Sequence, residues 1–149
     1  MVEETEEKAS SHNSGGNHCH FGHLRILLAE DNALNQEIAQ MLLSTKGASL
    51  DIVSNGQEAV DKFETSKPGT YQLILMDIRM PVMNGYTAAE KIRHSQHPDG
   101  ADIPIIAMTA DAYEDDIKHC MAVGMNGHIS KPINPDKLYN EIAKCCNGI

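Results

Sequence analysis

Two kinds of apolar pattern alternate along the chain from Leu24 onward. Short, nearly continuous apolar runs predict strands that are buried on both faces, at residues 24–29, 50–53, 72–76, 103–108 and 128–130. Between them, apolar residues recur three and four positions apart, which predicts helices at residues 34–46, 57–64, 87–93, 113–123 and 135–145. Right-handed crossovers join strands that alternate with helices. We therefore expect an α/β fold in which helices cover both faces of a five-stranded parallel sheet.

The first of these helices has its apolar residues on one stripe. Leu34, Ile38, Met41 and Leu42 fall on a single helical face, and Gly47 stands where the helix should end. An apolar stripe of this width is typical of a helix that packs on a sheet. We expect these four side chains to face the core.

The first 23 residues lack any such periodicity. They are acidic at first and then rich in Ser, Asn, Gly and His, so they cannot bury enough surface to offset the entropy cost of ordering. We interpret residues 1–23 as a flexible linker or cloning remnant, and residues 24–149 as one folded domain. His18, Cys19, His20 and His23 are residue types that bind zinc. Their spacing matches no closed zinc site, so a solvated linker is favoured.

Composition excludes several classes of function. The chain has 12 Lys and Arg against 21 Asp and Glu, a net charge of −9, so it has no general attraction to nucleic acid or to an anionic membrane. No apolar run reaches the roughly 20 residues of a membrane-spanning helix, and the acidic start is unlike a signal peptide. The 4 cysteines form no C-x-x-C pair, which favours free thiols in a reducing compartment. We expect a cytoplasmic protein.

Polar residues directly follow four of the predicted strands. Glu30 and Asp31 follow the first strand, Asp77 the third, Thr109 the fourth and Lys131 the fifth. Ligands of open parallel sheets bind beyond the carboxyl ends of the strands, so we expect these side chains to converge. Clustered carboxylates need a cation, and hard oxygen ligands that leave room for water suit Mg²⁺. A carboxylate beside Mg²⁺ can attack a phosphoryl group, whose oxygens the hydroxyl and the ammonium could then neutralise.

Four short motifs in order carry a family resemblance. They are Ala-Glu-Asp-Asn at 29–32, Met-Asp-Ile-Arg-Met-Pro-Val-Met-Asn-Gly at 76–85, Met-Thr-Ala at 108–110 and Ser-Lys-Pro at 130–132. With these motifs the chain resembles, from about Arg25 to Cys145, the receiver domain of two-component response regulators. Within that family it is most similar to receivers attached to hybrid histidine kinases. The resemblance implies a doubly wound, flavodoxin-like sheet with strand order 2-1-3-4-5.

The resemblance also implies roles for the acidic residues. Asp77 would accept the phosphoryl group and also contribute to a Mg²⁺ site. Asp31 would bind the ion directly, and Glu30 mainly through water. The backbone carbonyl of Arg79 would be a further ligand, independent of its side chain.

A second group of residues would bind the phosphoryl group and switch the conformation. The resemblance implies that Thr109 is the switch hydroxyl and that Lys131 binds the phosphate, with a cis peptide bond before Pro132. Three positions before the lysine the family usually has Tyr or Phe, whereas this chain has His128. Imidazole is smaller and titratable. We weigh a switch role for His128 against that of an ordinary edge-strand residue.

The leading hypothesis is a phosphorelay receiver module that accepts a phosphoryl group from a phosphohistidine and changes conformation. Such a module is not a conventional turnover enzyme, because it catalyses only its own phosphorylation and dephosphorylation. The resemblance implies a hybrid sensor histidine kinase as the parent. Its partner would be a histidine kinase transmitter domain or a histidine-containing phosphotransfer domain. We expect a monomer or weak dimer that contacts neither nucleic acid nor membrane.

Two other functions fit parts of the pattern. A Mg²⁺-dependent phosphohydrolase could use an aspartyl nucleophile on a similar sheet, but such enzymes commonly have a second Asp two positions later, where this chain has Arg79. A pseudo-receiver would bind partners without phosphorylation. The complete set of acidic residues, hydroxyl and lysine argues against that function.

Overall fold

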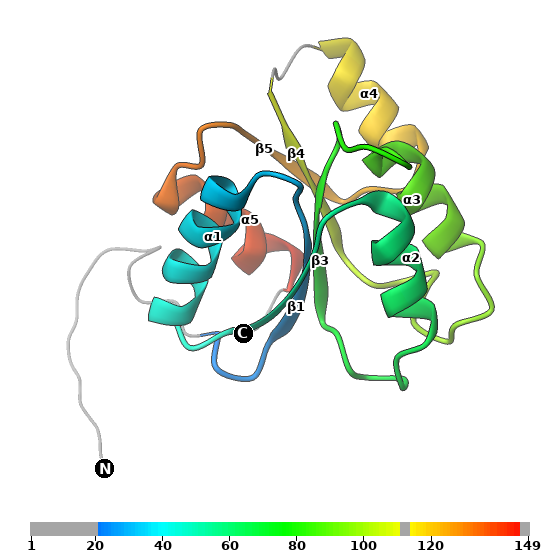
Figure 1. Cartoon of the computed structure of the whole chain (residues 1–149), viewed down its shortest axis with the longest axis horizontal. Helices are drawn as coiled ribbons and strands as arrows, with labels where there is room; N and C mark the ends of the chain where they lie inside the picture. Colours follow the sequence, from blue (N-terminus) through cyan, green and yellow to red (C-terminus); the bar gives the residue numbers. More distant parts are fainter. Residues whose placement is uncertain (1–20, 111–113, 147–149) are drawn as a thin grey trace.

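The computed structural model describes residues 21–110 and 114–146. Five parallel strands alternate with five helices along the chain (Figure 1). In order they are β1 (Arg25–Ala29), α1 (Ala33–Thr45), β2 (Ser49–Val53), α2 (Gly56–Glu64), β3 (Leu73–Asp77), α3 (Gly85–Arg93), β4 (Ile105–Thr109), α4 (Glu114–Ala122), β5 (Gly127–Ser130) and α5 (Pro135–Cys145). The strand order is β2-β1-β3-β4-β5, which confirms the predicted fold.

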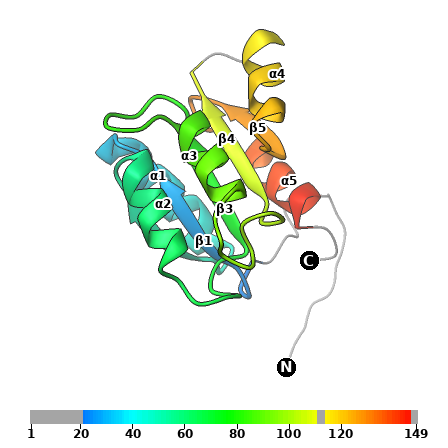
Figure 2. The same ribbon diagram turned by 90° about the vertical axis from the view of Figure 1, so that its right-hand side faces the viewer.

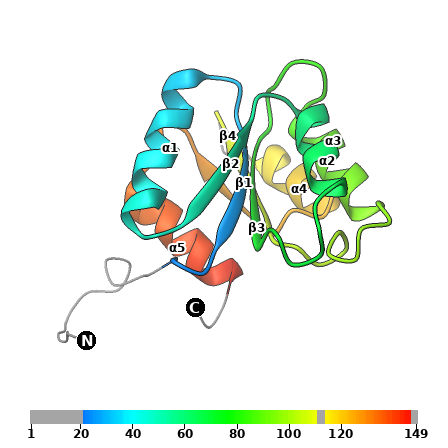
Figure 3. The same ribbon diagram turned by 60° about the horizontal axis from the view of Figure 1, so that its bottom comes forward.

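Helices cover both faces of the sheet. Figure 3 shows α1 and α5 on one side and α2, α3 and α4 on the other. Each side has its own apolar cluster, because alternate residues of the strands point to opposite faces. All residues of β3 and β4 are buried. These two neighbouring strands are therefore enclosed, and each ends in a polar residue, Asp77 for β3 and Thr109 for β4.

The predicted apolar stripe of α1 is confirmed only in part: Leu42 packs against the core and Ile38 is half-buried, but Leu34 and Met41 point away from it. Leu34 and Met41 are 63% and 62% exposed, whereas the buried residues of this helix are Ala39 and Leu43. Ala39 and Leu43 lie four positions apart on one face, so the helix packs through a small residue that permits close approach to the sheet.

The folded core includes Phe21, which lies before the domain boundary that we predicted after residue 23. Phe21 is fully buried, and its backbone N–H donates to the carbonyl oxygen of Lys46 at 2.8 Å. Its ring centroid lies 6.2 Å from that of Tyr139 on α5. The candidate zinc ligands at residues 18–20 lie outside the described residues. Among the described cysteines, Cys120, Cys145 and Cys146 are free thiols, and no described helix is long and apolar enough to cross a bilayer.

Asparagine caps tie most of the helices to the ends of strands or loops. The N-cap side chains of Asn32, Asn55, Asn84 and Asn134 each accept a hydrogen bond from a backbone N–H of the first turn. Such a cap satisfies one of the otherwise unpaired donors and fixes where the helix begins. The predicted cap at Asn134, with Pro135 at the first helical position, is confirmed.

Candidate functional site

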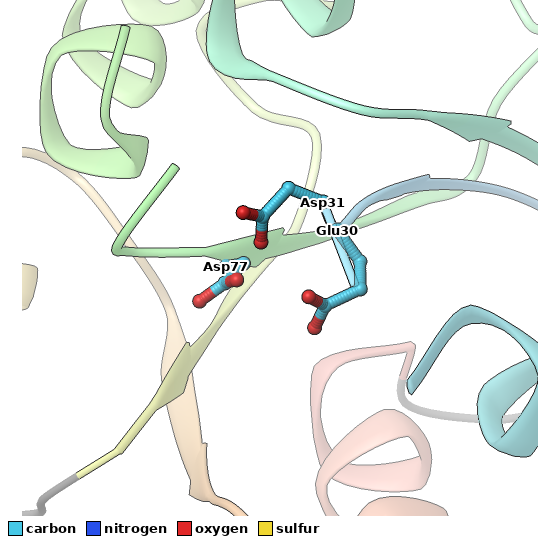
Figure 4. A group of neighbouring side chains, drawn as sticks. All are labelled: Glu30, Asp31 and Asp77. Carbon is cyan, nitrogen blue, oxygen red and sulfur yellow. The ribbon is translucent and has the colours of Figure 1, made fainter. Parts of the chain in front are cut away.

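The polar residues that follow the strands meet at the carboxyl edge of the sheet. Asp77 is the last residue of β3, and Glu30 and Asp31 follow the neighbouring strand β1. Figure 4 shows the three carboxylates gathered in the same space. One carboxylate oxygen from each residue lies within 4.8 Å of the others. Three acidic groups at such distances repel one another unless a cation lies among them.

Lys131 supplies positive charge to this acidic group. Its Nζ lies 2.9 Å from Asp77 Oδ2 and 2.8 Å from Glu30 Oε1. The lysine directly follows β5, and its backbone N–H donates to the carbonyl oxygen of Thr109 at 2.7 Å. The next peptide bond, Lys131–Pro132, is cis, as expected. One ammonium thus neutralises part of the charge of two buried carboxylates.

The two buried carboxylates differ in their ionisation. Asp77 is 3% exposed, and burial together with the charge of Glu30 raises its pKa to about 6, although Lys131 opposes this shift. Burial also disfavours ionised Glu30, but the Lys131 ammonium and the backbone N–H of Asn32 outweigh burial and lower the Glu30 pKa. For Lys131, burial acts to lower the pKa, and the two carboxylates overcome it and raise the pKa. Of the two buried carboxylates, Asp77 is therefore the one whose ionised form is disfavoured.

Thr109 contributes a buried hydroxyl at the end of β4. Its Oγ1 is buried and has no hydrogen-bond partner among the described residues. A buried hydroxyl without a partner costs roughly 1–3 kcal/mol, so the arrangement is suited to a ligand oxygen that accepts from it. Thr109 and Asp31 both line an open pocket of about 450 Å³ through which such a ligand could enter.

Glycine allows α3 to begin close to the acceptor candidate. A Cβ on Gly85 would lie 2.3 Å from the carbonyl oxygen of Asp77, which is too close for any other residue without a backbone shift. The Gly85 backbone N–H donates to the carbonyl oxygen of Ile78 at 2.9 Å. The glycine of the motif therefore holds the loop after β3 tightly over the strand end.

The sequence analysis missed one polar residue that supports the acid pair. The side-chain Nε2 of Gln36 donates to the carbonyl oxygen of Glu30 at 2.6 Å. Gln36 lies one turn before Ala39, on the face of α1 that packs on the sheet. Its register with Ala39 and Leu43 was the available signal, but the predicted stripe included neither of these residues.

The two remaining predicted residues are placed differently. Arg79 lines the pocket, and its backbone N–H donates to Asp77 Oδ1 at 3.3 Å. His128 lies on β5, half-buried, with Ala107 as its Cα partner on β4. It lines a separate pocket beside α5, with Lys137 and Glu141. The structure therefore brings Arg79 to the acidic group but not the His128 ring.

The donors at this edge fit a hard divalent cation. Carboxylate oxygens in a partly open pocket are the ligands that Mg²⁺ prefers, and the openness leaves room for retained water. Asp31 is exposed whereas Glu30 is 1% exposed, so Asp31 is the more accessible ligand. Burial and the Glu30 charge raise the pKa of Asp77, and a bound divalent cation would favour its ionised form.

Comparison with known proteins gives the same family throughout. The profile of the response regulator receiver domain matches residues 26–143. The chain is 39% identical over 120 residues to hybrid signal transduction histidine kinase I of Dictyostelium discoideum, an alignment that covers 79% of this chain and 7% of that protein. The curated relatives are far longer, since the chain spans 6% to 15% of their lengths.

Solved structures at similar identity have the same fold. One is the receiver domain of a sensor histidine kinase from Pseudomonas aeruginosa PAO1, which holds a magnesium ion in its active site cleft. It is 35% identical to this chain with a TM-score of 0.74, and the match covers 84% of this chain and 98% of that one. The Saccharomyces cerevisiae Ssk1 receiver domain, in complex with the histidine phosphotransfer protein Ypd1, is 32% identical with a TM-score of 0.72, covering 83% and 89%. This chain belongs to the response regulator receiver domain family.

Proposed function

We propose that this domain accepts a phosphoryl group from a phosphohistidine onto Asp77, in a reaction that depends on Mg²⁺, and then changes conformation. The observation that carries the proposal is the pairing of Asp77 with Lys131 beside a buried Thr109 hydroxyl that has no partner among the described residues. A carboxylate, an ammonium and a free hydroxyl are the groups needed to receive and hold a phosphoryl group.

The transfer uses the chain's own residues in defined roles. An Asp77 carboxylate oxygen attacks phosphorus, the bond from phosphorus to the imidazole nitrogen breaks, and the imidazole leaves with the bond's electron pair. The product is an acyl phosphate on Asp77. Lys131 Nζ, already 2.9 Å from Asp77 Oδ2, is placed to pair with a new phosphoryl oxygen. Thr109 can donate its hydroxyl to another.

A bound Mg²⁺ would offset the charge of the phosphoryl oxygens and of the carboxylates. Asp31, Asp77 and Glu30 would hold it, the last mainly through water, with the Arg79 carbonyl as a further ligand. Phosphoryl oxygens would draw Thr109 and Lys131 into new bonds, and these changes at the ends of β4 and β5 are the start of the conformational switch. We assign His128 a switch role on β5, with β4 between it and the strand that carries Asp77.

The partner and the parent protein follow from the same proposal. The donor would be a histidine kinase transmitter domain or a histidine-containing phosphotransfer protein, as in the Ssk1 complex with Ypd1. The similarity to hybrid histidine kinases supports a parent of that kind, acting in the cytoplasm. The domain would catalyse its own phosphorylation and dephosphorylation rather than turn over free substrates.

Labelling with a small phosphodonor tests the proposal. With Mg²⁺ and acetyl phosphate, intact-mass measurement should show one added phosphoryl group, removable by hydroxylamine, and chelation of Mg²⁺ should prevent its addition. Asp77→Asn should abolish labelling. Asp51→Asn, the same substitution at a carboxylate paired with Arg25 away from the site, should leave labelling intact. Equal labelling of Asp77→Asn and wild type would overturn the assignment, and steady phosphate release from many phosphomonoesters would support a phosphohydrolase instead.

A further inference from the structure

The loop from β1 to α1 carries the acid pair, Glu30 and Asp31. Figure 2 shows this loop at the same end of the sheet as the loop from β3 to α3, in agreement with the parallel pairing of β1 and β3. Asp31 is exposed, so the backbone that carries it decides where its carboxylate can lie. The placement of this carboxylate therefore depends on how firmly the loop is held.

Two hydrogen bonds hold the backbone of Glu30, one to β2 and one to α1. The Glu30 N–H donates to the carbonyl oxygen of Val53 at 3.0 Å. The Glu30 carbonyl oxygen accepts from the side-chain Nε2 of Gln36 at 2.6 Å. That carbonyl belongs to the peptide group that joins Glu30 to Asp31, and a peptide group is planar and rigid. The hydrogen bond from Gln36 therefore fixes the direction in which the chain enters Asp31.

Gln36 is itself held in place by the first turn of α1. It is half-buried, and its backbone N–H donates to the carbonyl oxygen of the N-cap residue Asn32 at 3.0 Å. The Asn32 side chain caps the same turn by accepting from the Asn35 backbone N–H at 3.0 Å. Ala39, three positions after Gln36, is buried against the sheet. The Gln36 side chain therefore reaches the loop from a helix that is fixed both by its cap and by its packing.

The carboxylate of Glu30 is held by other contacts. Its Oε2 accepts from the Asn32 backbone N–H at 3.0 Å, and its Oε1 lies 2.8 Å from Lys131 Nζ. Loss of the Gln36 hydrogen bond would leave both of these contacts in place. The loss would instead loosen the peptide group before Asp31, so its main effect should fall on the Asp31 carboxylate.

We propose that Gln36 is a positioning residue of the metal site, whose hydrogen bond to the Glu30 carbonyl makes the site selective for Mg²⁺ over Ca²⁺. The inference rests on the proposed function, because Asp31 is a ligand of the ion in that reaction. Mg²⁺ demands a nearly ideal octahedral arrangement of ligands, whereas Ca²⁺ accepts irregular arrangements at longer distances. A loosened Asp31 must be ordered when the ion binds, and the exact geometry of Mg²⁺ makes that cost larger for Mg²⁺ than for Ca²⁺.

NMR titrations of the unphosphorylated domain with Mg²⁺ and with Ca²⁺, followed at the backbone amides, test the proposal without any phosphodonor. Gln36→Met keeps an unbranched side chain with similar helix propensity but removes the N–H donor. We expect the affinity for Mg²⁺ to fall about fivefold and the affinity for Ca²⁺ to change less than about twofold. Gln40→Met is the matched control, because Gln40 lies one turn later on α1 and donates to Ser44 Oγ at 3.0 Å. It should leave both affinities unchanged.

Gln36→Glu is the second variant if Gln36→Met fails to fold, because an ionised carboxylate cannot donate to the Glu30 carbonyl. Its added charge attracts both divalent ions alike, so the ratio of Mg²⁺ affinity to Ca²⁺ affinity should still fall. An unchanged ratio in the folded variants would overturn the role of Gln36, whether both affinities stay the same or fall together. If the wild type binds no Mg²⁺, the proposed function fails and this inference fails with it. If the wild type binds Mg²⁺ and Asp31→Ala does not, an unchanged ratio refutes only the role of Gln36.

Discussion

Replacing Asp77 by asparagine should stabilise the metal-free domain, although it removes the acceptor that we propose. Asp77 is 3% exposed, and burial raises its pKa from 3.8 to about 6. A rise of about two in pKa means that ionisation at pH 7 costs the folded state about 3 kcal/mol relative to the unfolded chain. Asparagine has the same size, accepts from Lys131 and carries no charge. We expect Asp77→Asn to raise the free energy of unfolding by about 2–3 kcal/mol at pH 7.

The pH dependence of this gain has a definite sign. The folded-state pKa of Asp77 lies above the unfolded value of 3.8, so the cost of ionisation is complete above about pH 6 and absent where both states are protonated. The advantage of Asp77→Asn should therefore shrink as the pH falls from 6 toward 4. Added Mg²⁺ should also reduce the difference in free energy of unfolding between Asp77→Asn and the wild type, because the ion binds the folded wild type more tightly than the folded variant.

Urea denaturation followed by circular dichroism, in EDTA at pH 7 and at pH 5, measures both effects. Asp51→Asn is the matched control. Burial acts to raise the pKa of Asp51, but the hydrogen bonds from Tyr71 and Arg25 outweigh it and lower the pKa. Asp51→Asn should therefore lower the free energy of unfolding of the domain. The electrostatic account of the site is wrong if Asp77→Asn is no more stable than the wild type at pH 7. It is also wrong if the gain in stability over the wild type is as large at pH 5 as at pH 7.

Three further predictions concern the metal site, a loop and the core boundary. Asp31→Ala should weaken Mg²⁺ binding at least tenfold in a calorimetric titration, since it removes the most accessible carboxylate, and unchanged affinity would remove Asp31 from the site. Val82 is 81% exposed and has a φ of +68°, a backbone conformation that Asn tolerates better than Val or Ala. In a urea titration, Val82→Asn should therefore raise the free energy of unfolding by about 1 kcal/mol, whereas Val82→Ala should not. Phe21→Ala should cost about 3 kcal/mol, because it empties a fully buried position, and a loss below the error of the urea titration would exclude Phe21 from the core.

The order and kind of the elements follow from local pattern alone. Strands such as Leu73–Asp77 are buried on both faces, so their apolar runs are continuous and stand out from the helical spacing around them. The acidic and basic residues of the site could also be found from the sequence, because each directly follows a strand and the carboxyl ends of parallel strands share one edge. The motif at residues 76–85 then indicated the family, which the comparisons confirm.

Tertiary structure decided the features that depend on contacts between segments distant in the sequence. The buried face of α1 centres on Ala39 and Leu43, with Leu42 packed against the same core, whereas Leu34 and Met41 are exposed. Phe21 is in the core because α5 brings Tyr139 to it from the other end of the chain. The two contacts of Lys131 and the hydrogen bond from Arg93 to the Gly124 carbonyl oxygen join segments far apart in sequence. Local periodicity contains no information about such long-range distances, since they are set when the helices pack on the sheet.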